Sequence, residues 1–281
     1  MAEDRAGQTP LDLGASLLLP IGKTAWTERD TPIMLRGVDG RYLRGFLNAV
    51  REGRDQRIRG YEQAWRLNVL VEWDPPFDQS EYERPLTSRN FVHTHVLEWT
   101  ASAKAPLLAR VPEQYRGRPT LFLSYTWDSD WFANGWGVIE ALSDHLRPRD
   151  HVWMDVFCHN QHNIGSVADQ MEAVISGVDR LLLPMSQPEW YQRAWCIWEV
   201  LCAIKHQKPI QFLEYGRKLR DYKRIRQYYL ANFRGIEASE ATVAEDKELI
   251  IAFAKSLFGS IAKTDRTLEE FMEQVIGPTA P

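Results

Sequence analysis

The sequence has few cysteines, no excess of positive charge and no long hydrophobic run. Its 281 residues include three cysteines, Cys158, Cys196 and Cys202, and an odd count with irregular spacing does not make a disulfide framework. The thiols therefore indicate a reducing compartment. The 34 Lys and Arg against 38 Asp and Glu give a formal net charge of −4, without the clustered basic excess that phosphate contacts require. We therefore expect no nucleic-acid partner.

Membrane and export signals are also missing. No stretch approaches the ~18 apolar residues that a membrane-spanning helix needs. The start, MAEDRAGQTPLDLG, is acidic early and lacks the basic region and long apolar core of a secretory signal. We expect a soluble, cytoplasmic protein with no membrane partner. Gly-x-Gly-x-x-Gly and P-loop patterns are absent too, so the sequence supports neither hydride transfer nor ATP hydrolysis.

What the chain has in abundance is tryptophan. It contains 11 Trp, and Phe and Tyr bring the aromatic share to 11%. Such a surplus suits a large core, a stacking platform for a sugar or nucleobase, or a contact surface. Hydrophobic residues at 44% and charged residues at 26% are typical of a globular chain. The length predicts about two domains, or one large one.

Residues 1–115 give mixed signals. Residues 42–59 have a partly helical pattern, whereas 67–73 and 91–99 have the composition or alternation of strands. We therefore expect this region to form a small α+β domain or extension of unknown role. The sequence changes character at an Arg-Gly-Arg-Pro step, where we place the start of a second domain that spans residues 118–281.

After that step, short apolar runs alternate with helical patterns. The runs cover residues 120–125, 151–157, 180–186 and 208–215, with a fifth candidate strand at 233–238. The helical patterns cover residues 131–146, 166–178, 188–205, 243–258 and 268–276. Strands that alternate with helices of about 10 to 15 residues form βαβ units around a parallel sheet. We therefore predict an α/β fold, a doubly wound, flavodoxin-like parallel sheet of about five strands.

The predicted sheet indicates where a site would lie. Ligands of such sheets bind outside the carboxyl ends of the strands, near the point where the strand order reverses. Ser124 and Tyr125 follow the first apolar run, Asp155 lies in the second, and Ser186 ends the third. These residues are therefore expected at the rim of a candidate site.

Three segments together resemble the Toll/interleukin-1 receptor (TIR) domain. FLSYTWDSDWF at residues 122–132 is similar to the first TIR box. Residues 152–186 resemble the second strand with its Asp, the long loop and the helix that leads to the third strand. WYQRAWCIWEV at residues 190–200 is similar to the family's WC-x-x-E helix start. The resemblance covers residues 118–280, and the CHNQH loop and the high Trp density depart from it.

The resemblance implies two kinds of function. Some TIR domains are non-catalytic scaffolds for protein–protein interaction in signalling. Others cleave the nicotinamide–ribose bond of NAD+ with a glutamate at the WC-x-x-E position, which is Glu199 here, to give nicotinamide and ADP-ribose or a cyclic ADP-ribose. NAD+ is then the substrate, and no cofactor is implied. Homo-oligomers formed through TIR–TIR contacts, an upstream activating protein or ligand, and a role in immunity or cell death follow by analogy.

The chemistry of this bond suits a single carboxylate. Cleavage passes through an oxocarbenium-like state, whose positive charge a carboxylate near the ribose stabilises. Nicotinamide leaves from a cationic nitrogen, so no general acid is required. On a helix over residues 195–206, Glu199 shares a stripe with Trp195 and Cys202, beside an apolar stripe that should face the sheet. The alternative is that Glu199 is a solvated charge near the positive end of its helix.

Six more residues are candidates for binding the substrate beside Glu199. They are Ser124, Tyr125, Trp127, Asp128, Asp155 and Trp195. The aromatic members could stack on nicotinamide or adenine, or they could be packing residues at a strand end. For Asp155 the resemblance favours a structural role, in which its carboxylate caps the following loop.

Other polar clusters have simpler interpretations. Cys158, His159 and His162 are residue types that zinc prefers, but a fourth ligand at usable spacing is missing, so we expect no metal site. Cys196 has no identifiable base and is interpreted as a small buried hydrophobe. The basic run at residues 217–226 is typical of a solvated helix face.

Overall fold

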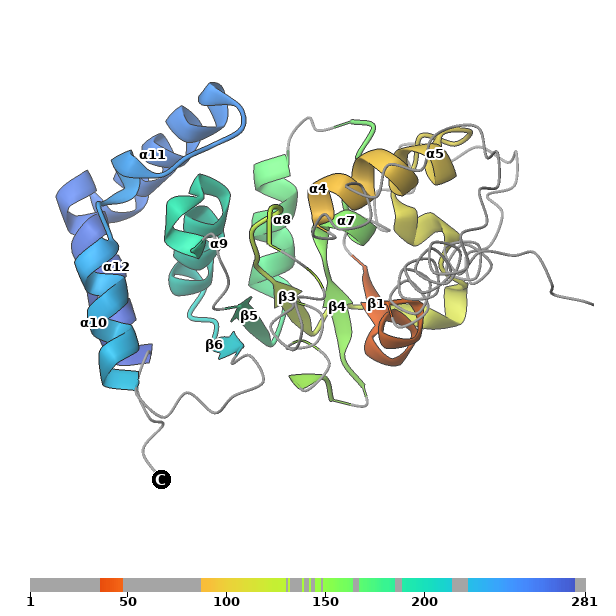
Figure 1. Ribbon diagram of the computed structural model, residues 1–281, viewed down its shortest axis with the longest axis horizontal. Coiled ribbons are helices and arrows are strands. Elements are labelled where there is room, and N and C mark those ends of the chain that lie inside the picture. The colour runs from red at the N-terminus through yellow and green to blue at the C-terminus, as the bar shows by residue number, and fades with distance from the viewer. Residues whose placement is uncertain are drawn as a thin grey trace, which may run out of the picture.

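The computed structural model contains one mixed β-sheet flanked by helices (Figure 1). It describes residues 36–47, 87–129, 131, 138, 142, 145–147, 149–163, 167–184, 189–213 and 222–275. Within these residues the sheet has six strands, in the order β2-β1-β4-β3-β5-β6. The strands are β1 (Gly37–Asp39), β2 (Arg116–Gly117), β3 (Leu121–Leu123), β4 (His151–Trp153), β5 (Arg180–Pro184) and β6 (Ile210–Leu213).

Four neighbouring strands of the sheet run parallel. β3 pairs in parallel with β4 on one side and with β5 on the other, and β5 pairs in parallel with β6. Strands β3 and β5 are buried along their whole length, as expected of parallel strands covered on both faces. The predicted α/β class with a mostly parallel sheet is therefore confirmed.

The edge of the sheet differs from an all-parallel arrangement. β1 pairs antiparallel with β4, and β2 pairs antiparallel with β1. Both strands come from residues before Arg118, so the described N-terminal residues extend the same sheet. Buried Val38, Phe46 and Phe91 also belong to the same hydrophobic cluster as the central strands. The division into domains 1–115 and 118–281 stays a prediction.

The pairing of β1 with β4 leads to a first testable prediction. A Cβ added at Gly37 would lie 2.9 Å from the backbone oxygen of Val152, which cannot move without disturbing β4. Gly37→Ala should therefore cost about 1–3 kcal/mol of unfolding free energy in urea titrations. The matched change Gly45→Ala lies in the helical stretch 40–47, where nothing is within 4 Å, and should stabilise by about 0.5–1 kcal/mol. A neutral Gly37→Ala would contradict the β1–β4 pairing.

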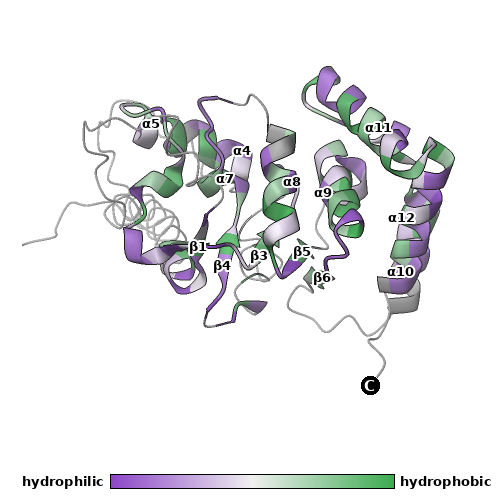
Figure 2. Cartoon of the chain, turned by 180° about the vertical axis from the view of Figure 1, so that it is seen from behind, coloured by the Kyte–Doolittle hydropathy of each residue, from purple (hydrophilic) through white to green (hydrophobic). Residues whose placement is uncertain are grey.

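The longer helices largely follow the predicted order along the chain. They are α8 (Val167–Gly177), α9 (Ala194–Lys205), α10 (Tyr222–Asn232), α11 (Ala244–Phe258) and α12 (Ile261–Val275). Helix α9 packs between α8 and α11, and α12 contacts α10, α11 and β6. In Figure 2 α9 is mainly white and green, whereas α11 and α12 carry more of the hydrophilic purple. Helix α9, which carries Glu199, is therefore an interior helix and not a surface one.

Residues 91–99 were predicted as a strand, and this prediction is wrong. The segment is helical, as α4 (Ser88–Phe91), a π-helical turn η2 (Val92–Val96) and α5 (Leu97–Thr100). Phe91, His95 and Trp99 recur every four residues, and their rings contact one another in sequence at 5.4 Å and 5.2 Å. The same residues also satisfy a two-residue alternation, which is why the pattern resembled a strand. The Thr87 side chain, which accepts a hydrogen bond from the Asn90 amide, caps the start of the helix.

The fifth strand expected at 233–238 is also absent. The chain there turns at Gly235, whose φ of 84° is left-handed, and then forms the short 3-10 helix η6 (Ile236–Ala238). Asp265 of α12 accepts the Ile236 amide proton at 2.8 Å, so the segment is bound to a helix rather than to the sheet. The predicted strand at 67–73 and most of the predicted helix at 131–146 lie outside the described residues.

The remaining short elements connect these units. They are η3 (Leu107–Arg110), η4 (Glu113–Tyr115), α7 (Asp155–Cys158) and η5 (Trp190–Gln192). The predicted strand 151–157 ends at Trp153, because Asp155 already starts α7. Among the described residues, no helix combines the length and apolar character that crossing a membrane requires.

Candidate functional site

The candidate site lies where the central strands end. Ser124 directly follows β3, and its amide donates a 2.9 Å hydrogen bond to the Leu182 carbonyl of β5. Asp155 follows β4 and is the first residue of α7. β3 is the point at which the chain order of the parallel strands reverses, because its successor β4 lies on one side and β5 on the other. The structure thus brings Ser124 and Asp155 to the place that the strand-end rule indicated.

Glu199 is a buried carboxyl group on α9. The residue is 7% exposed, and its Oε2 makes no hydrogen bond within the described part of the chain. Burial raises the pKa of Glu199 well above its ordinary value, and the nearby charge of Asp155 adds to the rise. The Ser124 hydroxyl lies beside the carboxyl and opposes this rise, although neither Ser124 Oγ nor Glu199 Oε2 has a partner at normal hydrogen-bond geometry. The alternative of a solvated surface charge is therefore wrong.

Asp155 is the acceptor of a small hydrogen-bond network. Tyr125 donates its hydroxyl proton to Oδ1 at 2.7 Å, and the amide of Val156 donates to the same oxygen at 2.7 Å. The indole N–H of Trp127 donates to Oδ2. Burial raises the pKa of Asp155, and these donors oppose the rise because they stabilise the ionised form. Gln161 also binds the Asp155 carbonyl, so this residue both organises the loop and faces the site.

Tyr125 is held at both sides of its hydroxyl. The residue is 6% exposed, and its hydroxyl lies 2.6 Å from Ser88 Oγ and 2.7 Å from Asp155 Oδ1. Burial raises the pKa of Tyr125 well above the ordinary range and the Asp155 charge adds to this, whereas the hydrogen bond with Ser88 lowers it. At neutral pH Tyr125 is therefore a neutral hydrogen-bond donor and not a base.

Two of the predicted binding residues point elsewhere. Asp128 pairs with Arg89, whose Nε donates to Oδ1 at 2.7 Å, and this hydrogen bond lowers the pKa of Asp128. Trp195 donates its indole N–H to Asp246 of α11 at 3.0 Å. Its ring meets that of Trp198 edge-on at 5.8 Å. The structure therefore brings together Glu199, Ser124 and the Tyr125–Asp155–Trp127 network, and it engages Trp195 with α11.

Three residues at the site were not predicted as members of it. Ser88 and Arg89 of α4 contact Tyr125 and Asp128, 37 and 39 positions further along the chain. Cys196 lies one helical turn before Glu199, and burial raises its pKa well above the ordinary value, with the charge of Glu199 adding to the rise. A neutral, buried thiol agrees with its interpretation as a small hydrophobe. The Thr87-Ser88 step, a typical helix start, was the one local signal for α4.

The cysteine and histidines after β4 do not converge. Cys158 is buried, and its Sγ lies 4.0 Å from the Val152 carbonyl. His159 is buried, which lowers its pKa to about 4, and His162 Nε2 lies 2.7 Å from Thr100 Oγ1. Across the described ranges, no three His, Cys, Asp or Glu side chains are grouped to hold a metal ion.

Comparison with protein-family models, curated proteins and solved structures found no match for this chain. The interpretation of the site therefore depends on the sequence resemblance to TIR domains and on the geometry above. That geometry is one buried carboxyl group without a paired cation, beside an organised hydrogen-bond network around Asp155, at the carboxyl ends of β3 and β4. No cation is paired with Glu199 in the described part of the chain. Such a site suits a ligand that brings its own positive charge.

Proposed function

We propose that this protein is a TIR-type NAD+ glycohydrolase in which Glu199 is the essential carboxylate. The observation that carries the proposal is the buried Glu199 carboxyl, whose Oε2 lacks a partner beside the end of β3. Leaving a buried polar atom unpaired costs about 1–3 kcal/mol, so its retention at a sheet switch point needs a functional reason. The strand order β4-β3-β5-β6 supports the proposal, because it matches the first four strands of a flavodoxin-like sheet.

In the proposed reaction the nicotinamide–ribose bond breaks and its electron pair stays on the nicotinamide nitrogen. Nicotinamide leaves as a neutral molecule, and the ribosyl carbon becomes oxocarbenium-like. The Glu199 carboxylate stabilises that positive charge. Water then adds to the carbon and releases a proton, giving ADP-ribose, or a nitrogen of the adenine ring adds and gives a cyclic product.

The raised pKa of Glu199 defines when the site becomes active. Burial favours the protonated form, which cannot stabilise a cation. A cationic nicotinamide ring at the site favours the ionised form, because an opposite charge within about 4–6 Å lowers a carboxyl pKa. Substrate binding, or self-association that reshapes the site, would thus switch Glu199 to its active state. We propose homo-oligomerisation through TIR-type contacts, triggered by a protein or ligand, as that second route.

The alternative function is a non-catalytic interaction module. The low exposure of Glu199 favours it, since a scaffold has no need of an open carboxylate. One assay separates the two functions: the purified chain is incubated with NAD+, dilute and under crowding, and nicotinamide release is followed by chromatography. We expect release that rises with self-association and is lost in Glu199→Ala. Absence of release in every assembled state would favour the scaffold, and release unaffected by Glu199→Ala would exclude Glu199 as the catalytic group.

A further inference from the structure

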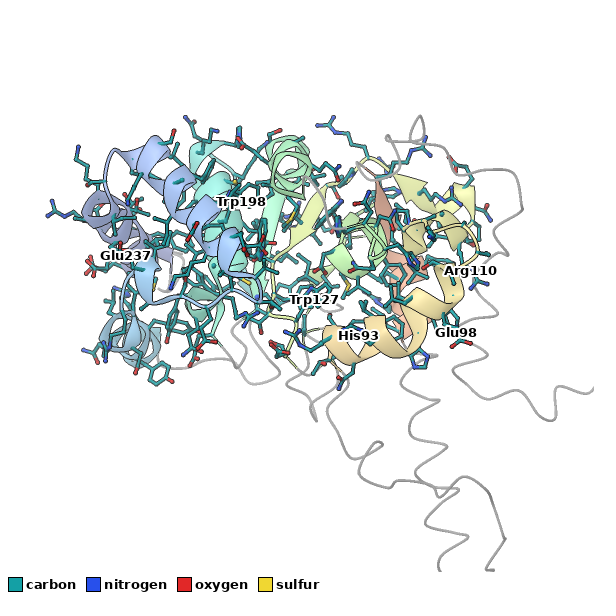
Figure 3. The ribbon with its side chains drawn as sticks, turned by 90° about the horizontal axis from the view of Figure 1, so that it is seen from above. His93, Glu98, Arg110, Trp127, Trp198 and Glu237 are labelled. Atoms are coloured by element: carbon teal, nitrogen blue, oxygen red, sulfur yellow. The ribbon has the colours of Figure 1, made fainter. Side chains whose placement is uncertain are left out.

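The first turn of α4 is docked on the segment that follows β3. The Arg89 amide donates to the Trp127 carbonyl at 3.3 Å. The Arg89 guanidinium donates two hydrogen bonds to Asp128, from Nε to Oδ1 at 2.7 Å and from Nη2 to Oδ2 at 3.2 Å. Figure 3, seen from above, places Trp127 near the middle of the molecule, close to the helical segment that carries His93. A part of the chain before the TIR-like region therefore touches the candidate site.

Ser88 is the buried member of this contact. The residue is fully buried, and its Oγ lies within hydrogen-bond distance of two aromatic side chains in the segment after β3. Trp131 Nε1 is 2.9 Å away and Tyr125 OH is 2.6 Å away. An indole N–H can only donate, so Ser88 Oγ accepts from Trp131. Tyr125 uses its own proton on Asp155 Oδ1, so the Ser88 proton points to the Tyr125 oxygen. The protons thus run in one direction, from Trp131 through Ser88 and Tyr125 to Asp155.

This series of hydrogen bonds fixes the orientation of the Tyr125 hydroxyl, which could otherwise rotate. Each hydrogen bond in a buried chain polarises the next, so a donor on the Tyr125 oxygen strengthens the bond from Tyr125 to Asp155. Asp155 in turn is close enough to Glu199 for its charge to act on that carboxyl. We infer that Ser88 is a positioning residue, which holds the Tyr125 hydroxyl on Asp155 and so sets the surroundings of Glu199. This inference rests on the proposed function and gives the N-terminal segment a part in the site.

The kinetic test uses a double-mutant cycle on the full chain. Ser88→Ala should lower kcat for nicotinamide release about tenfold, the equivalent of one hydrogen bond, with KM changed less than twofold. Ser88→Thr keeps the Oγ atom and should restore most of the rate. If Ser88 acts through Tyr125, adding Ser88→Ala to Tyr125→Phe should slow the enzyme no further. Ser176→Ala, which removes an exposed serine hydroxyl on α8, is the matched control. If Ser88→Ala lowers kcat by the same factor in the wild type and in Tyr125→Phe, the inference is overturned.

A second readout does not depend on activity. In ¹H–¹⁵N spectra the indole N–H signals of Trp127 and Trp131, assigned with Trp→Phe variants, report the two ends of the network. Ser88→Ala should shift the Trp131 signal and also that of Trp127, because Trp127 shares the Asp155 carboxylate with Tyr125. An unmoved Trp127 signal would overturn the inference. Should Ser88→Ala not fold, Tyr125→Phe gives the same test from the other side, through the Trp131 signal.

The two readouts separate the failure of each proposal. A wild-type chain that never releases nicotinamide overturns the proposed function, and the indole signals then decide alone whether Ser88 orients Tyr125. An active wild type whose rate is unaffected by Ser88→Ala overturns the positioning role and leaves Glu199 as the catalytic group.

Discussion

Glu199→Gln should lower nicotinamide release at least 100-fold and leave the protein as stable as the wild type or more stable. Glutamine keeps the size and shape of the side chain but cannot carry the negative charge that stabilises the oxocarbenium-like state. Removal of one group that stabilises transition-state charge costs about 10²–10³ in kcat. Stability should not fall, because the Glu199 carboxyl has no charged partner to lose in the described structure.

The pH dependence of the stability difference follows from the raised pKa. Burial holds the folded-state pKa of Glu199 above the ordinary 4.5, so the folded protein binds a proton that the unfolded chain releases. The stability that depends on this proton is fully present below pH 4.5 and is lost as the pH rises through the folded-state pKa. Glutamine has no such loss, so the advantage of Glu199→Gln in thermal unfolding should grow between pH 4.5 and pH 8.

Glu269→Gln is the matched control, since Glu269 is exposed on α12. It should leave nicotinamide release unchanged. Two outcomes would contradict the assignment of Glu199. One is substantial release by Glu199→Gln. The other is a loss of stability in Glu199→Gln that grows with pH, which would mean that the carboxyl is ionised and paired in the folded protein.

The fold was predictable where local patterns decide it. The apolar runs around Phe122, Leu182 and Phe212 indicated buried parallel strands, and β3, β5 and β6 lie there. The helix at 166–178 corresponds to α8. The antiparallel edge was not predictable, because β1 (Gly-Val-Asp) and β2 (Arg-Gly) are short and, unlike β3, are not runs of apolar residues. Nothing local in a sequence says that so short a segment will pair with a strand over a hundred residues away.

The site was predictable only in part. The strand-end rule and the TIR resemblance together placed Ser124, Asp155 and Glu199 at one edge of the sheet, and the structure brings these three together. The engagement of Trp195 with Asp246 was not foreseen, because helical spacing gives the angle of a side chain but not which neighbour covers it. Ser88 was not predicted as a site residue for a related reason. Its role comes from hydrogen bonds to distant residues, and a lone serine carries no pattern that indicates such partners.

A buried ion pair at the opposite ends of the strands gives the largest expected effect on stability. Asp150 precedes β4, and Arg180 begins β5, with side chains only 6% and 7% exposed. Arg180 Nη2 donates to Asp150 Oδ2 at 2.7 Å, and the Arg147 amide donates to the same oxygen at 2.7 Å. Thr120, just before β3, adds a hydrogen bond to Oδ1 at 3.1 Å. One carboxylate therefore joins the starts of three neighbouring parallel strands.

Asp150→Ala should cost about 3–5 kcal/mol of unfolding free energy, because it leaves the Arg180 guanidinium buried without its partner. Asp128→Ala, which breaks the exposed pair with Arg89, should cost only about 0–1 kcal/mol and serves as the control.

Burial alone would raise the pKa of Asp150, but the Arg147 amide and the Arg180 guanidinium outweigh it and hold the pKa below the ordinary 3.8. The contribution of the Asp150–Arg180 pair to the free energy of unfolding is therefore present above pH 3.8 and is lost as the pH falls through the folded-state pKa. Urea unfolding of the wild type and Asp150→Ala at pH 7 and pH 3 measures the loss of stability and its dependence on pH. A cost below about 1 kcal/mol at pH 7 would mean that water reaches Arg180 once Asp150 is gone.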